Sequence, residues 1–318
     1  MSSTKKVLVT GGAGFIGSNL IEALLQRDYK VVCLDDLSTG RIENIEEFKG
    51  DKNFDFVEGS ILDFDLLIKL TKGLSAISHQ AALGSVPRSI KDPITSNRVN
   101  IEGTLNVFKA AVDNKVERVV YAASSSTYGD SSALPKVESN IGRPLSPYAV
   151  TKAVNELYAG VFHRVYGLNT IGLRYFNVFG PKQNPEGPYA AVIPLFIKAI
   201  LSGESPIING DGDQSRDFTY VQNAVQANIK SLEISLQAYN SIYNVAFGEQ
   251  TTLNALAGYI NEIVGLNLRP IYGQEREGDI KHSLADISKA KDQLGYAPEY
   301  DILKGLKETI NWFTKNNL

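Results

Sequence analysis

Residues 7–17 read VLVTGGAGFIG, a short β-branched run that ends directly in spaced glycines. The run predicts a buried strand and the amphipathic segment after it predicts a helix, so the glycines occupy a strand-to-helix turn. Because Gly11 and Gly14 carry no Cβ, the backbone can turn tightly there and approach a pyrophosphate, whose charge a helix N-terminus favours. Gly17 lets helix and strand pack closely. This stretch therefore predicts a dinucleotide site at the first turn of an α/β fold.

A carboxylate follows the second predicted strand. Residues 30–34 form another β-branched run, and Asp35 comes directly after it, 24 positions after Gly11. A carboxylate at this strand end accepts hydrogen bonds from the adenosine ribose hydroxyls and repels a 2′-phosphate. The sequence therefore favours NAD over NADP, although Arg41 would weaken this preference if its side chain swung toward the ribose.

The first half of the chain continues to alternate β-branched runs with longer amphipathic segments. This alternation is typical of βαβ units around a parallel sheet. The apolar faces of the helices expected at 101–112 and 149–165 fit either the core of the domain or a dimer contact. Strands are expected at residues 6–10, 30–34, 54–58, 76–79, 118–122, 170–173 and 241–246, and further helices at 221–232 and 302–313.

The regular alternation of β-branched runs with amphipathic segments ends after about residue 177, where glycines and prolines interrupt it. We expect a second, looser lobe to begin there. The prediction is an α/β protein with a Rossmann-type, doubly wound parallel sheet and a smaller C-terminal α/β lobe that binds substrate. The NAD-binding domain comprises residues 1–175, to which residues 218–247 return, and the lobe comprises residues 176–217 and 248–318.

Composition excludes several classes of protein. The chain has 318 residues, a formal net charge of −3 and a sequence pI of about 5.8, so it lacks the basic footprint of a nucleic-acid-binding protein. No apolar run reaches the roughly 18 residues of a membrane span, and no secretory signal is recognisable, which favours the cytoplasm. The lone cysteine, Cys33, is expected to be buried in its strand. The three histidines have no partner at helical spacing, so no metal site is expected.

Tyr148 and Lys152 stand four residues apart and share one face when the segment is helical. A phenol with a pKa of about 10 is a poor base at neutral pH, and a nearby ammonium favours its phenolate. The lysine and a positive nicotinamide together are expected to lower the pKa of Tyr148. Ser124 follows the strand expected at 118–122, at the sheet edge where open α/β sheets bind ligands. These three side chains form a candidate proton-transfer site.

These features resemble the extended short-chain dehydrogenase/reductases, and within them the nucleotide-sugar 4-epimerases, over essentially the whole chain. The glycine spacing G-x-x-G-x-x-G is a variant typical of that family. The resemblance implies a UDP-hexose substrate, tightly held and recycled NAD, and a homodimer in which the helices at 101–112 and 149–165 pair. The segments that carry it are TGGAGFIG (10–17), LDDL (34–37), HQAA (79–82), NIEGT (100–104), YAVTK (148–152), LRYFNVFGP (173–181) and RDF (216–218).

The resemblance also assigns roles by position. It places Ser124, Tyr148 and Lys152 at the reaction centre, Asn177 and Arg216 at the substrate diphosphate, and Arg276 and Asp279 nearer the uridine. The implied cofactor contacts are Gly11, Gly14, Phe15, Ile16, Asp35, Asp36, Ser38, Thr39, Gly40, Ser60, Ile61, Gln80, Ala81, Ala82, Asn100, Ser124, Tyr148, Lys152, Tyr175 and Val178. The implied substrate contacts are Gly84, Ser85, Ser125, Ser126, Tyr148, Asn177, Ala191, Val192, Ile208, Arg216, Arg276, Asp279 and Ser283.

Under this resemblance, Tyr148 takes the proton of the sugar C4 hydroxyl while hydride passes to the nicotinamide, and the 4-keto sugar turns over before hydride returns to its other face. Two rival reactions are disfavoured. The dehydratases carry an Asp-Glu pair where this chain has Ser125, Ser126 and Thr127, and the reductases need exchangeable NADPH, which Asp35 opposes. A non-catalytic NAD-binding sensor is the remaining alternative, although such proteins typically lose the Tyr or the Lys.

The resemblance implies that Ser283, seven positions after Arg276, influences the choice of sugar. In the resembling epimerases this position lines the pocket beside the C2 substituent, where a tyrosine fills the space that an acetamido group needs and a serine leaves it open. The segment GSVPRS (84–89) is also similar to that of the UDP-N-acetylglucosamine 4-epimerases. The expectation is interconversion of UDP-GlcNAc and UDP-GalNAc, with UDP-Glc and UDP-Gal as further candidate substrates.

Overall fold

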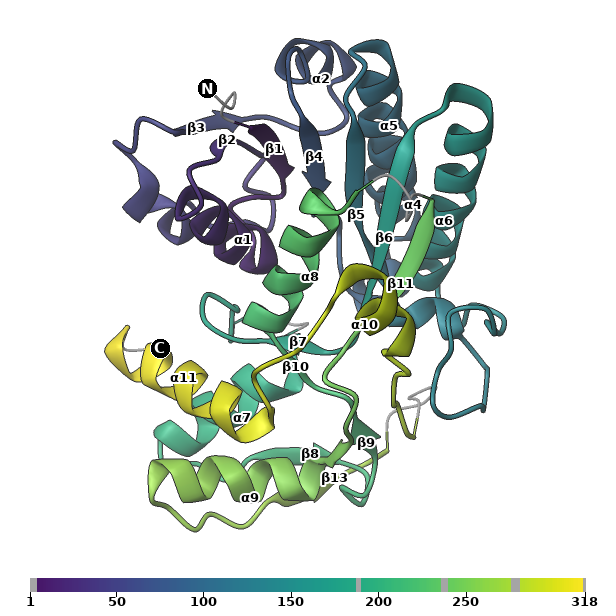
Figure 1. The fold of residues 1–318 in the computed structure, drawn as a ribbon. Helices are drawn as coiled ribbons and strands as arrows, with labels where there is room; N and C mark the ends of the chain where they lie inside the picture. Colours follow the sequence, from purple (N-terminus) through teal and green to yellow (C-terminus); the bar gives the residue numbers. More distant parts are fainter. Residues whose placement is uncertain (1–4, 187–189, 236–239, 276–280, 317–318) are drawn as a thin grey trace.

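A seven-stranded sheet forms the centre of the larger part of the molecule (Figure 1). The computed structural model describes residues 5–186, 190–235, 240–275 and 281–316. The strand order is β11-β6-β5-β4-β1-β2-β3, and every neighbouring pair is parallel. The predicted Rossmann-type α/β fold is therefore confirmed. The strands are β1 (Lys6–Thr10), β2 (Lys30–Asp35), β3 (Phe54–Glu58), β4 (Ala76–His79), β5 (Arg118–Ser124), β6 (Asn169–Tyr175) and β11 (Ser241–Val245).

Helices cover both faces of this sheet (Figure 1). Successive residues of β1 belong to two separate hydrophobic clusters, Leu8 to one and Val9 to the other, because neighbouring side chains of a strand point to opposite faces. Both side chains are fully buried, which explains why Val7, Leu8 and Val9 form an uninterrupted apolar run in β1. One face carries α1 (Phe15–Leu25) and α8 (Val221–Glu233), and the other carries α2 (Phe64–Leu70), α5 (Gly103–Asp113) and α6 (Pro147–Tyr166).

The order of the strands reverses between β1 and β4. The chain passes outward from β1 to β3 and then returns to the other side of β1, where Thr10 pairs with His79 at the ends of the two strands. In an open parallel sheet such a reversal creates a crevice beyond the carboxyl ends of the strands. The glycine turn follows Thr10 directly, so the turn lies at this crevice.

A smaller part of the chain lies beyond those carboxyl ends (Figure 1). Its described residues include three helices that pack on one another and a short parallel strand pair. The chain enters it after β6, returns to the sheet through α8 and β11, and enters it again. Its elements are α7 (Val192–Leu201), α9 (Leu253–Val264), α11 (Ile302–Lys315) and the pair β8 (Ile207–Asn209) and β13 (Ile271–Gly273).

Short elements connect the two parts. The pairs β7–β10 and β9–β12 each join segments distant in the sequence. These strands are β7 (Val178–Phe179), β9 (Ser215–Arg216), β10 (Thr219–Tyr220) and β12 (Thr251–Thr252). The remaining helices are α3 (Val86–Lys91), α4 (Pro93–Asn97) and α10 (Ser288–Leu294), with single turns at η1 (Ile42–Asn44), η2 (Glu46–Phe48), η3 (Arg98–Glu102) and η4 (Ser125–Tyr128).

The two apolar helix faces in the sequence have different surroundings. On α5, Phe108 and Ala111 are fully buried, so this face belongs to the core. On α6, Leu157 is 69% exposed and Val165 is 64% exposed, so that face is uncovered in a single chain. Cys33 is fully buried, as expected.

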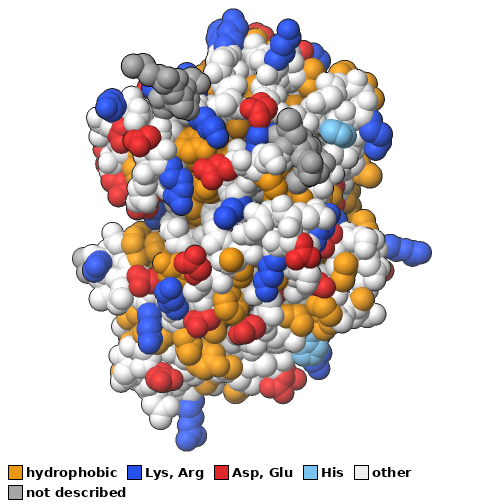
Figure 2. All heavy atoms as spheres, viewed as in Figure 1, with side chains coloured by type: hydrophobic (Ala, Val, Ile, Leu, Met, Phe, Trp, Pro, Cys, Tyr) orange, Lys and Arg blue, Asp and Glu red, His pale blue; other side chains and the backbone are white. Residues whose placement is uncertain are grey.

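The surface carries charges of both signs, interspersed over the face in Figure 2. Within the described ranges, no helix has both the length and the apolarity needed to cross a bilayer. Among the same residues, no group of three or more His, Cys, Asp or Glu side chains lies close enough together to hold a metal ion.

Candidate active site

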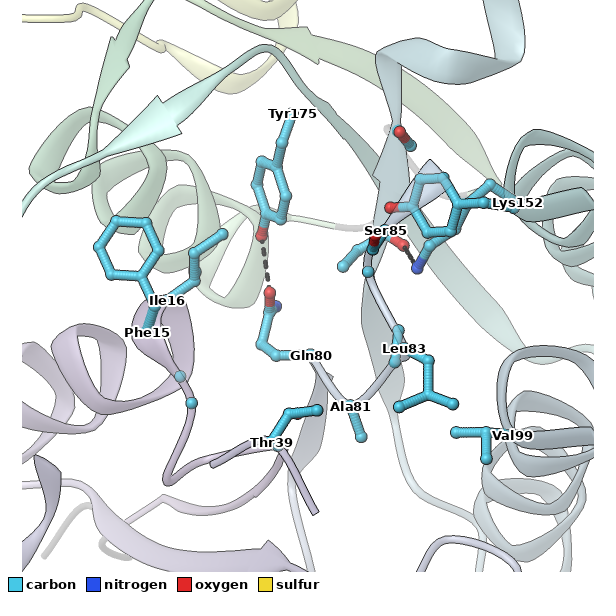
Figure 3. A pocket seen from close by; sticks show the side chains of 18 of the residues that line it. Phe15, Ile16, Thr39, Gln80, Ala81, Leu83, Ser85, Val99, Lys152 and Tyr175 are labelled. Carbon is cyan, nitrogen blue, oxygen red and sulfur yellow. Dashed lines mark hydrogen bonds between the residues drawn. The ribbon is translucent and has the colours of Figure 1, made fainter. Parts of the chain in front are cut away.

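A cavity of about 600 Å³ lies at the carboxyl ends of the parallel strands (Figure 3). The glycine turn, the ends of β2, β5 and β6, the loop after β4 and the first turns of α6 form its walls. Elements far apart in the sequence thus meet at the predicted edge of the sheet. The predicted site residues that line it are Gly11, Gly14, Phe15, Ile16, Asp35, Asp36, Ser38, Thr39, Ile61, Gln80, Ala81, Ala82, Gly84, Ser85, Ser124, Ser125, Tyr148, Lys152, Tyr175, Asn177 and Val178.

A second cavity, of about 530 Å³, adjoins the first. The two share four lining residues, which are Val86, Ser124, Ser125 and Asn177. The second alone is lined by three further predicted substrate residues, which are Ser126, Arg216 and Ser283. The fold therefore brings Ser283 to the cavity that begins at the catalytic candidate Ser124.

The glycine turn forms a cradle that only glycine permits. Gly11 has a φ of +67°, and a Cβ there would lie 2.6 Å from the backbone nitrogen of Ala81. A Cβ on Gly17 would overlap the carbonyl oxygen of Gly11. Gly14 is the N-cap of α1 and provides no side-chain cap, so the first N–H groups of the helix stay available to an anionic ligand. The turn fits a pyrophosphate.

Asp35 ends β2 with its carboxylate against the glycine turn. Its Oδ2 accepts the backbone N–H of Ala13 at 3.0 Å and its Oδ1 that of Leu37 at 2.9 Å. Burial raises the pKa of Asp35 from its ordinary value. Each carboxylate oxygen has a second lone pair that can accept from a ribose hydroxyl. The nearby Arg41 pairs with Glu186 at 3.8 Å rather than turning to this carboxylate.

Ser124, Tyr148 and Lys152 all line the first cavity. The capping hydroxyl of Ser146, which accepts from the Ala149 N–H at 3.1 Å, starts α6 directly before Tyr148. One helical turn further on, the Lys152 ammonium donates to the Ala122 carbonyl at 2.8 Å and lies 5.9 Å from the Tyr148 ring centroid. The geometry suits a proton-transfer site.

The pKa of Tyr148 departs from the expectation. Burial raises it, and a hydrogen bond with Ser124 only partly opposes this rise. Burial also lowers the pKa of Lys152 to about 8. Burial and the Ser124 hydrogen bond together leave the pKa of Tyr148 above its ordinary value, so the expected lowering requires the positive charge of a bound nicotinamide.

Several predicted site residues line neither cavity. Gly40 packs on Asp35, since a Cβ there would lie 2.6 Å from its Oδ1. Ile208 is fully buried in β8. Ala191 is the N-cap of α7, outside both linings. The other predicted contacts outside both linings are Ser60, Asn100 and Val192. The predicted uridine contacts Arg276 and Asp279 lie outside the described residues.

Asn100 acts behind the cavity wall. Its Oδ1 accepts the Leu83 N–H at 2.8 Å, and its Nδ2 donates to the Leu83 carbonyl at 3.2 Å and to Thr151 Oγ1 at 3.1 Å. Asn100 is 1% exposed, and these bonds clamp the loop after β4 to α6. The residue thus supports the lining without contributing to it.

Sequence reasoning also missed some lining residues. Leu83, Val86, Arg88 and Val99 line the first cavity, and Lys136 lines the second. Val86 and Arg88 lie within the GSVPRS segment (84–89), and the resemblance of this segment could have indicated both as lining residues. Lys136 sits in a segment with no regular pattern, and no motif indicated it.

A hydrogen-bonded network forms the wall opposite Lys152. Tyr175 and Gln80 are joined through Oη and Oε1 at 3.1 Å, as the dashed line in Figure 3 shows, and Asn228 Nδ2 donates to the Tyr175 hydroxyl at 2.7 Å. Gln80 also donates to Asn228 Oδ1 at 3.0 Å. The network links the end of β4 to β6 and α8 at the edge of the cavity.

The chain is similar to known proteins over nearly its whole length. Residues 7–246 match the model of the NAD dependent epimerase/dehydratase family. A "Putative UDP-glucose 4-epimerase" of Methanocaldococcus jannaschii is 38% identical over 98% of this chain and 99% of that relative. A UDP-N-acetylglucosamine 4-epimerase from Methanobrevibacter ruminantium M1, solved with UDP-N-acetylmuramic acid, is 45% identical with a TM-score of 0.94, covering 98% of this chain and 99% of that one.

A third relative was solved with a dinucleotide. This UDP-glucuronic acid 4-epimerase from Bacillus cereus, in complex with UDP-glucuronic acid and NAD, is 32% identical with a TM-score of 0.91, covering 98% of this chain and 99% of that one.

Fold and site together define a dinucleotide-dependent enzyme of the extended short-chain dehydrogenase/reductase class. The chain belongs to the NAD dependent epimerase/dehydratase family, and its cofactor is NAD. The glycine cradle and Asp35 fit that cofactor.

Proposed function

We propose that the protein interconverts UDP-GlcNAc and UDP-GalNAc by inverting C4 of the sugar. The observation that carries this proposal is that Ser283, rather than a bulky side chain, lines the cavity that begins at Ser124. An acetamido group needs this space. The 45% identity to a UDP-N-acetylglucosamine 4-epimerase supports the same sugar.

In this proposal Tyr148 exchanges the proton of the C4 hydroxyl. The Ser124 hydroxyl holds the same sugar oxygen, and the Lys152 ammonium fixes the ribose of the cofactor. NAD, when bound, supplies reversible oxidation at C4 together with a positive charge beside the phenol. Asn177 and Arg216 bind the diphosphate, since an arginine fork can donate two bonds to phosphate oxygens. Residues 176–217 and 248–318 form the lobe that holds the nucleotide sugar.

Two other functions compete with this one. UDP-glucose and UDP-galactose have no acetamido group and fit the same cavities, so they are the second substrate pair. Dehydration is opposed by the absence of Asp or Glu among the described residues that line the second cavity.

The proposed function is tested by incubating the purified protein separately with UDP-GlcNAc, UDP-GalNAc, UDP-Glc and UDP-Gal and identifying the products. No product from any of the four would overturn the proposal.

Replacing Ser283 with tyrosine should separate the two substrate pairs. Ser283 is 9% exposed, so a phenol there fills the cavity. We expect kcat/KM for UDP-GlcNAc to fall at least about tenfold while UDP-Glc turnover changes little, because added bulk excludes only the larger sugar. Ser283→Ala, which adds no bulk, is the matched control. Undiminished turnover of UDP-GlcNAc by Ser283→Tyr would mean that this position does not select the sugar.

We also propose that the protein is a homodimer joined through α6. Leu157 and Val165 on this helix are 69% and 64% exposed, and uncovered apolar side chains in one stripe favour association. Leu157→Glu should therefore yield a monomer in sedimentation velocity. Leu266→Glu, at a 42% exposed leucine outside α6, should leave the mass unchanged. A wild-type monomer would contradict the proposal.

A further inference from the structure

The second cavity contains a cation that the proposed reaction does not use. Apolar side chains form much of its wall, and Lys136 lines it together with Ser126 and Ser283. The apolar lining residues are Val86, Pro87, Ile90, Tyr128, Leu145, Ala149 and Phe176. An ammonium in such surroundings is costly unless something compensates its charge.

The backbone fixes Lys136 beside the segment that carries Ser283. The Lys136 N–H donates to the Leu284 carbonyl at 2.7 Å, and the Asp286 N–H donates to the Lys136 carbonyl at 3.0 Å. Asn244 Nδ2 donates to that same carbonyl at 2.8 Å. Lys136 is 4% exposed, so its position is set by the fold and not by solvent.

The ammonium of Lys136 lacks an acidic partner. Its Nζ donates to the Ser131 carbonyl, and within the described ranges no carboxylate lies within 4.0 Å of it. An ammonium has three donors, so two remain for a ligand. No Asp or Glu is among the described residues that line this cavity. Burial lowers the pKa of Lys136, as expected for a cation removed from water without a counter-charge.

These observations point to a ligand with an acceptor oxygen. We propose that Lys136 determines substrate specificity by donating to an oxygen acceptor on a substituent of the hexose, either an acyl carbonyl or a carboxylate. The proposal rests on the proposed function, because it places the sugar between Ser124 and the second cavity. Among the described residues that line this cavity, Arg216 is the other cation. The proposed function assigns Arg216 to the diphosphate, so Lys136 remains to bind the substituent. A sugar without such a substituent gains nothing from Lys136.

The test compares wild type with Lys136→Met on three substrates. UDP-GlcNAc presents an acyl carbonyl, UDP-glucuronic acid presents a carboxylate, and UDP-Glc presents neither. We expect kcat/KM and affinity to fall at least about tenfold for UDP-GlcNAc or UDP-glucuronic acid, and less than about twofold for UDP-Glc. The substrate that loses affinity identifies the acceptor. Affinities are measured by calorimetry so that the result does not require turnover.

Two further variants keep the test decisive. Lys289 also donates to a backbone carbonyl, that of Ile242 at 2.9 Å, but it lines neither cavity. Lys289→Met should therefore leave kcat/KM and affinity unchanged for all three substrates. Lys136→Arg retains the positive charge and the donors, so it should keep the preference for the acceptor-bearing sugar over UDP-Glc. If Lys136→Met fails to fold, Lys136→Arg still tests the proposal. An equal loss on all three substrates, no loss on any, or loss of the preference in Lys136→Arg would overturn the proposal. Absence of turnover by wild type would instead contradict the proposed function.

Discussion

Tyr148→Phe should lower kcat for sugar epimerisation by about 10²- to 10⁴-fold, the usual contribution of a positioned acid–base group. The substitution removes only the hydroxyl that exchanges the C4 proton. It keeps the ring and the backbone N–H that donates to Ser89 Oγ at 3.0 Å, so the start of α6 should stay intact. The measurement is steady-state turnover together with the NAD content of the purified protein, which should not change.

The matched control is Tyr158→Phe, which changes a tyrosine on the same helix that packs on the core outside both cavities. Its turnover should equal that of wild type. If Tyr148→Phe kept more than about a tenth of wild-type turnover, Tyr148 could not be the group that moves the proton.

The second large effect concerns stability. Arg174 is 2% exposed and its guanidinium holds Glu156 through two bonds, from Nε at 2.9 Å and from Nη2 at 2.8 Å. Arg174→Met leaves the Glu156 carboxylate buried without its partner, one turn beyond Lys152. We expect the free energy of unfolding in denaturant to fall by about 3–5 kcal/mol.

Two controls separate this effect from general damage. Arg174→Met combined with Glu156→Leu removes both charges and should recover much of the loss, because paired removal leaves no uncompensated charge. Lys49→Met breaks an exposed pair with Glu46 at 2.6 Å and should cost less than about 1 kcal/mol. A loss below about 1 kcal/mol for Arg174→Met alone would show that the buried pair is not needed for stability.

The fold could be predicted because its signals are local. The strands expected at 6–10, 54–58 and 76–79 coincide with β1, β3 and β4, since each contains a short run rich in β-branched or aromatic residues. The turn at Gly11 was equally clear, because its backbone conformation and the approach of Ala81 exclude a Cβ.

The site was harder to predict where contacts join distant segments. Lys136 reaches the second cavity because its backbone pairs with Ala285. No periodic pattern in the sequence predicts a contact between segments so far apart. Asn100 was predicted near the cofactor, and the bonds of its side chain to Leu83 could not be foreseen because they depend on the tertiary fold. The raised pKa of Tyr148 also escaped prediction, since burial depends on the whole fold.

The most direct test of the central claim uses UDP-GlcNAc that carries deuterium at C4. If the C4 hydrogen is removed and returned within one active site, the product is UDP-GalNAc with the deuterium still at C4, which NMR can establish in ordinary water. Unlabelled UDP-GalNAc, release of a 4-keto or dehydrated sugar, or recovery of the substrate unchanged would contradict the account.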